Sequence, residues 1–107
     1  MRVYVKATLP VEAGNAVIKS GKLGPTLQAI IQDLKPETVF FFTDQQGRRT
    51  TNLLMDLKDA SQIPAIAEPF FLAFNASVEI HPVMLAEDLE KAGPAIGQAV
   101  ERYGGTL

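Results

Sequence analysis

Residues 77–81 alternate strictly in polarity, and this alternation constrains the fold more than any other feature of the chain. Val78 and Ile80 point to one side of the predicted strand, whereas Ser77, Glu79 and His81 point to the other. Such a pattern indicates a strand in a sheet that is covered on one face only. The stretch also carries the single histidine of the chain, next to a carboxylate on the same face. It therefore predicts part of the core and a candidate polar site together.

Three other stretches also predict strands. Residues 2–9 alternate in the same way until Pro10 ends the pattern. Residues 38–43 contain a β-prone Val-Phe-Phe-Phe run, and residues 48–57 follow it after a turn at 44–47. Gly47 suits this hairpin because it accepts a positive φ. With the final strand placed at 75–83, the chain is expected to form four strands.

Helices are expected between and after these strands. Residues 11–34 have helical spacing in two pieces, broken at 20–24, with Pro25 in the first turn of the second piece. The last helix, residues 86–103, is interrupted at Gly93-Pro94.

The helix expected at 59–72 begins with Asp59 or Ser61 as its cap, and Pro69 predicts a kink or an early end. We expect this helix to bury a set of apolar side chains: Ile63, Ile66, Phe70 and Phe71.

The order β-α-β-β-α-β-α predicts one ferredoxin-like α+β domain over residues 1–107, with strand order 4-1-3-2 and an additional C-terminal helix. A trial register places Tyr4 near Glu79 and Leu54, and Lys6 near Ser77 and Asn52. In this register the helix-covered face is apolar. It collects Val3, Val5, Ala7, Val39, Phe41, Leu53, Met55, Val78 and Ile80.

The second face of the predicted sheet is too aromatic for plain solvent exposure and too polar for a core. It collects Tyr4, Lys6, Phe40, Phe42, Thr50, Asn52, Leu54, Ser77, Glu79 and His81. An exposed patch of this kind usually marks an interface or a ligand site. We therefore expect a homodimer, with a second copy of the chain covering this face.

This element order and face polarity resemble the dimeric α+β barrel superfamily. The segments 61–71 and 81–84 look like those of small bacterial proteins of that type without an assigned activity. The resemblance implies two ferredoxin-like subunits with their open sheet faces together and a ligand cavity. Members include cofactor-independent monooxygenases, muconolactone isomerases and haem-binding enzymes, and no motif in this chain selects one of them.

Composition excludes several classes of function. The net charge is −2 and the ten basic residues are dispersed, so we expect no nucleic-acid or membrane partner. The chain has no cysteine and one histidine, which argues against a zinc site, and we expect no metal and no cofactor. Without a signal-like apolar segment, the chain is expected to be cytoplasmic.

His81 and Glu79 are the candidate catalytic residues. His81 could be a general base, a proton shuttle or a haem ligand, or a structural histidine bonded to Glu79, Arg2 or Asp56. Glu79 could be a carboxylate with an altered pKa, or only the partner of Lys6 in an interface ion pair.

The candidate ligand-binding residues are Tyr4, Lys6, Phe40 and Asn52, with Phe42 packing beside Phe40. One reading is a protein that binds or transforms a small aromatic or enolisable molecule. The alternative is a non-catalytic dimeric interaction module whose face only buries itself. Around the hairpin, Asp44, Arg48 and Arg49 could bind an anion, or could serve the turn alone.

Overall fold

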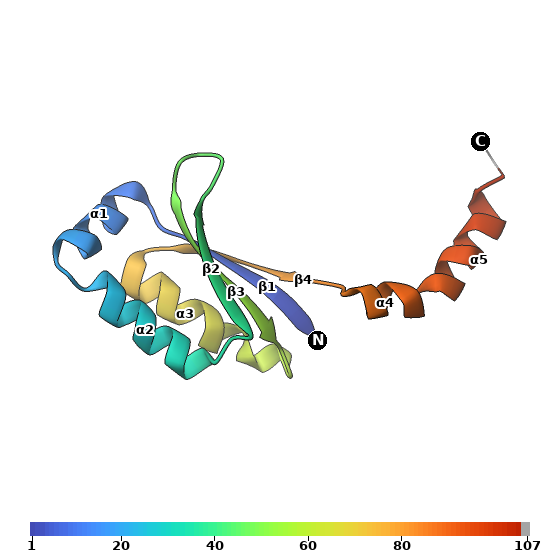
Figure 1. Cartoon of the computed structure of the whole chain (residues 1–107), viewed down its shortest axis with the longest axis horizontal. Coiled ribbons are helices and arrows are strands. Elements are labelled where there is room, and N and C mark those ends of the chain that lie inside the picture. The colour runs from blue at the N-terminus through green and yellow to red at the C-terminus, as the bar shows by residue number, and fades with distance from the viewer. Residues whose placement is uncertain (106–107) are drawn as a thin grey trace.

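The computed structural model describes residues 1–105 and has the predicted element order. Four antiparallel strands form one sheet in the order β2-β3-β1-β4, which is the predicted arrangement (Figure 1). The strands are β1 (Arg2–Thr8), β2 (Thr38–Thr43), β3 (Arg49–Asp56) and β4 (Ser77–Pro82). The fold is therefore the expected ferredoxin-like α+β arrangement.

Five α-helices and a short 3₁₀ turn accompany the sheet in the described residues. Helices α1 (Val11–Lys19), α2 (Leu23–Leu34) and α3 (Ile63–Phe74) lie on one side of it, and the 3₁₀ turn Ala60–Gln62 precedes α3 (Figure 1). Helices α4 (Ala86–Lys91) and α5 (Gly93–Tyr103) project away from this body (Figure 1). None of the helices within residues 1–105 has both the length and the apolar character needed to cross a membrane.

The core lies between the sheet and the helices. Val3, Val5 and Leu53 from the two central strands are fully buried against Ile66 and Phe70. The side chains of the edge strands are less covered: Val39, Val78 and Ile80 pack against the core only in part. Phe41 was expected on this face and is 59% exposed, because the helices leave the outer edge of β2 uncovered.

Helix α3 differs from its prediction. It neither ends nor breaks at Pro69 but continues to Phe74, where Asn75 closes it in a left-handed conformation with φ of 51°. Proline removes one helical hydrogen bond, yet the burial of Ile66 before it and of Phe70 and Phe74 after it holds the helix against the sheet. Ile63 and Phe71 were expected in the core but are each 40% exposed, since they lie outside the buried stripe.

The register of β4 is shifted by two residues from the trial register. Tyr4 pairs with Leu54, as predicted, but with His81 rather than Glu79. Lys6 pairs with Asn52, as predicted, but with Glu79 rather than Ser77. The shift leaves each side chain on its predicted face, because the side-chain period of a strand is two residues.

The β2–β3 hairpin is held by Asp44. Its Oδ1 accepts hydrogen bonds from the backbone N–H groups of Gln46 and Arg48, both at 2.9 Å, and its Oδ2 lies 2.9 Å from Nη2 of Arg48. Gly47 has the predicted positive φ, 77°. The backbone N–H of Arg48 is the main cause of the lowered pKa of Asp44, and the Arg48 side chain lowers that pKa further. These groups therefore serve the turn itself.

We expect Val78→Asp to destabilise the fold by roughly 3 kcal/mol, because it places an unpaired charge under the helices. The neighbouring replacement Glu79→Gln lies on the opposite face and should cost less than about 1 kcal/mol, since Glu79 is exposed. Urea denaturation of the two variants measures both values. Equal losses would contradict the assignment of faces.

A second prediction concerns the hairpin and pH. The folded-state pKa of Asp44 lies below its ordinary value of 3.8, so its carboxylate stabilises the fold above that pH and loses this effect as the pH falls through the lower folded value. Asp44→Asn should therefore lower the free energy of unfolding at pH 7, and the difference from wild type should shrink below about pH 3.8. A deficit that stayed constant into acid would contradict this cause.

Candidate functional site

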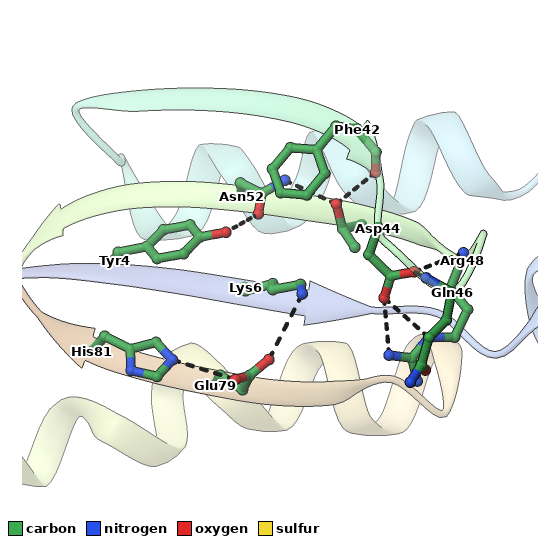
Figure 2. Close-up of polar contacts among 10 residues, drawn as sticks. Tyr4, Lys6, Phe42, Asp44, Gln46, Arg48, Asn52, Glu79 and His81 are labelled. Atoms are coloured by element: carbon green, nitrogen blue, oxygen red, sulfur yellow. Dashed lines mark hydrogen bonds and ion pairs between the residues drawn. The ribbon is translucent and has the colours of Figure 1, made fainter.

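The sheet surface opposite α1–α3, here called the open face, contains all six predicted site residues. Phe40 comes from β2. Figure 2 shows the other five: Tyr4 and Lys6 on β1, Asn52 on β3, and Glu79 and His81 on β4. Alternation along each strand places them on one side of the sheet. The pairing of neighbouring strands then brings residues that are far apart in sequence into contact.

Four rings form a row across the whole width of the open face. The centroids of Phe42 and Phe40 lie 6.1 Å apart, those of Phe40 and Tyr4 6.3 Å, and those of Tyr4 and His81 6.3 Å. The planes of Phe40 and Tyr4 differ by only 8°. Phe40 and Phe42 are each 44% exposed, so this aromatic row presents a broad apolar surface to whatever lies above it.

A polar network lies beneath the aromatic row. The hydroxyl of Tyr4 donates to Oδ1 of Asn52 (Figure 2). Nδ2 of Asn52 donates to the Phe40 carbonyl at 3.1 Å and to Oγ1 of Thr50 at 3.0 Å. The Thr50 hydroxyl in turn donates to the Phe42 carbonyl at 2.6 Å. Asn52 is completely buried. It therefore fixes the Tyr4 hydroxyl and the backbone of β2 in place.

Tyr4 remains a neutral phenol at physiological pH. Its partial burial raises its pKa above the ordinary value of 10.0, and the nearby Glu79 carboxylate raises the pKa further. Because its proton is directed to Asn52, the lone pairs of the phenol oxygen are left to accept a hydrogen bond from a ligand.

Charged groups run beside the aromatic row (Figure 2). Nζ of Lys6 lies 4.0 Å from Oε2 of Glu79, and Oε1 of Glu79 lies 3.4 Å from Nε2 of His81. The side chains of Glu79 and His81 are 54% and 55% exposed, whereas that of Lys6 is 23% exposed. With Nε2 directed at the carboxylate, the Nδ1 atom of His81 is left for a ligand. In residues 1–105, no three acidic or histidine side chains gather to hold a metal ion.

Thr50 is the residue that the sequence-based choice of site residues missed. It had been placed on the open face without a role, yet its buried hydroxyl links Asn52 to the edge strand. Its position two residues before Asn52 on the same face is the only sequence signal for this link.

The charged groups of the open face lie on an exposed surface, since the side chains of Glu79 and His81 are both more than half exposed. Two grooves of the described residues are lined by other side chains. One groove, of about 270 Å³, runs along the edge of β2 beside α2, and another, of about 480 Å³, lies between the end of α2 and the start of α3. Neither is lined by His81 or Glu79. A small ligand on the open face would therefore need a second wall to be enclosed.

Comparison with known proteins shows the fold. No family model and no curated protein sequence matches the chain. Among solved structures, it is similar to 5-chloro-2-hydroxyhydroquinone dehydrochlorinase (TftG) from Burkholderia phenoliruptrix AC1100, in complex with 2,5-dihydroxybenzoquinone. The TM-score is 0.60 at 15% identity, over 81% of this chain and 97% of that one.

A formyltetrahydrofolate deformylase from Pseudomonas putida KT2440 is more distant. Its TM-score is 0.47 at 17% identity, and the match covers 78% of this chain and 29% of the deformylase. The similarity to TftG, with the higher TM-score, agrees with the α+β fold of this chain.

Proposed function

We propose that two copies of this chain pack their open faces together and enclose a pocket that binds or transforms a small aromatic or enolisable molecule. The observation that carries the proposal is the aromatic row, which lies exposed beside Lys6, Glu79 and His81. Flat rings provide a stacking surface for a flat ligand, and the charged groups beside them provide proton transfer and charge stabilisation at its edge.

A second copy is the natural cover for this face. A monomer would leave Phe40 and Phe42 in water beside the ring of Tyr4, an arrangement that soluble proteins usually bury. Ferredoxin-like sheets of the dimeric barrel type place such a face against its own copy, and the fold of this chain is of that type. The same contact would supply the second wall that a ligand requires.

Each residue has a role in this proposal. Phe40 and Phe42 stack on the apolar part of the ligand, and Tyr4, held by Asn52, accepts a hydrogen bond from it. Nδ1 of His81 takes a proton from an acidic O–H or C–H group while its Nε2–H donates to Glu79. The Lys6 ammonium stabilises the negative charge that develops on the ligand oxygen.

The similarity to TftG supports the ligand class. That enzyme acts on a chlorinated hydroxyhydroquinone and was solved with a dihydroxybenzoquinone, both small oxygenated rings. At 15% identity the likeness extends to the fold alone, so the chemistry proposed for this chain rests on the residues of its own open face.

A non-catalytic dimeric module is the second candidate. One observation favours it: within residues 1–105, every buried side-chain polar atom already has a hydrogen-bond partner. The Asn52 and Thr50 side chains are already paired within the chain, so their network alone needs no ligand. The two candidates differ in one measurable property: the open-face dimer contains either a cavity or a filled interface.

We expect the protein to sediment at micromolar concentration with twice the mass of one chain. The reason is the apolar surface of the aromatic row, which association would remove from water. Analytical ultracentrifugation measures this mass directly. A monomer across that concentration range would contradict the proposed dimer.

We further expect His81→Gln to leave the dimer folded and to weaken binding of 2,5-dihydroxybenzoquinone at least about tenfold, because glutamine cannot take up a proton near neutral pH. Ser77→Gln is the matched control, on the same strand and face but outside the aromatic row. Isothermal titration calorimetry gives the affinities.

Ser77→Gln should retain the affinity of the wild type. A folded His81→Gln dimer that bound the quinone with unchanged affinity would contradict a role for His81 in binding. Failure of the wild-type dimer to bind would exclude this class of quinone as its ligand.

A further inference from the structure

Within residues 1–105, the C-terminal arm, defined here as residues 83–102, does not pack on the helices α1–α3. Helices α4 and α5 follow one another along the chain and extend beyond the end of β4, away from the sheet and α1–α3 (Figure 1). The molecule is 60 Å long but only 30 Å and 21 Å in its other dimensions, and the arm forms one end of the long axis.

One side of the arm is apolar along its whole length. Leu85, Leu89, Ala92, Ile96 and Val100 follow one another at intervals of three or four residues. Among them, Leu89 is 53% exposed, Ile96 50% and Val100 62%. The opposite side carries the polar residues Glu87, Glu90, Lys91, Gln98, Glu101 and Arg102. This pattern is typical of an amphipathic helix that packs its apolar side against an apolar surface.

Such an arm requires a surface to pack against. α4 has 6 residues and α5 has 11, whereas an isolated helix shorter than about 12 to 15 residues is marginal in water. Tertiary packing of the apolar stripe must therefore supply most of the stability of these helices, and the body of the same chain does not supply it.

An apolar groove of matching character lies at the edge of β2. Leu23 and Leu27 of α2 form one wall and Phe41 the other, with Phe41 59% exposed. Arg49 lines the groove and Lys22 immediately precedes α2. The arm carries four carboxylates and two basic side chains, a net charge of −2. This charge complements that of Arg49 in the groove lining and of Lys22 next to Leu23 in the sequence.

The groove of the same chain is poorly placed for its own arm. The arm starts after Pro82, which pairs with Val3 at one end of the sheet. The groove lies at the opposite end of the sheet, near Arg49 and Thr50. It also lies beside β2, which is the edge strand farthest from β4. Helices α1–α3 cover the face between these two corners (Figure 1).

We propose that the arm of each copy crosses to the other copy and lies with its apolar stripe in the β2–α2 groove there. The inference rests on the proposed homodimer and deepens it, because a two-fold pair would use both arms and both grooves in the same way. Each exchanged arm then covers Phe41, a large apolar side chain of the helix-covered face that the fold leaves 59% exposed.

Disulfide trapping tests this exchange, because the chain has no cysteine of its own. One sample of the full chain carries Ile96→Cys, a second carries Phe41→Cys, and the two are mixed, allowed to exchange subunits and mildly oxidised. Gln98→Cys replaces Ile96→Cys in the control, since Gln98 lies on the opposite side of α5. A disulfide requires Cα atoms within about 7 Å of each other. We expect the 96–41 product to exceed the 98–41 product at least about tenfold.

Three results would overturn the exchange. A predominant 96–96 product would mean that arms pair with each other. A link within one chain, in protein carrying both Ile96→Cys and Phe41→Cys, would mean that the arm folds back. A dimer with no enrichment of the 96–41 link would mean that the arm lies elsewhere. If Phe41→Cys fails to fold by circular dichroism, Leu23→Cys takes its place on the other wall of the groove.

Sedimentation of the same reduced samples separates this inference from the proposed function. A dimer without the 96–41 link removes only the arm exchange and leaves the open-face dimer standing. A monomer at micromolar concentration removes both.

Discussion

The one-sided burial of the sheet determines the rest of this structure. Helices α1–α3 cover a single face, and the side chains of β1 and β3 that point at them, such as Val5 and Leu53, are removed completely from water. Burial of that apolar surface is the main stabilising contribution to the fold. Because a strand alternates, the same residues that build the core force every second side chain onto the open face. The aromatic row and its charged neighbours are thus a direct consequence of how the core is made.

The open face is ordered before any partner or ligand arrives. Asn52 is buried and fully hydrogen-bonded, and it links Tyr4 on β1 to the backbone of β2. A satisfied buried network of this kind holds its members in one geometry. Fixed rings and a fixed phenol lose little conformational freedom on binding, which favours recognition of a rigid, flat molecule.

The sequence predicted the faces of the sheet better than its details. Polarity with a period of two residues identified the strands and placed Lys6 and Glu79 together on the open face, and a two-residue error in the register of β4 left that result intact. Because a shift of two residues leaves every face unchanged, the polarity pattern did not reveal that Tyr4 pairs with His81. The prediction that α3 ends early at Pro69 was wrong, because tertiary packing of Phe70 and Phe74 outweighs one lost helical hydrogen bond. The helix over residues 86–103 was predicted with its interruption at Gly93-Pro94, but nothing in the sequence showed that α4 and α5 would leave the body of the chain.

The central claim is that the open face of one copy lies against the open face of another. Nuclear magnetic resonance on a dimer of one isotope-labelled and one unlabelled copy tests it directly, by detecting only contacts between protons of different chains. The account predicts intermolecular contacts from the ring protons of Phe40, Phe42 and Tyr4. Intermolecular contacts confined to other surfaces, with these rings in contact only with their own chain, would contradict it.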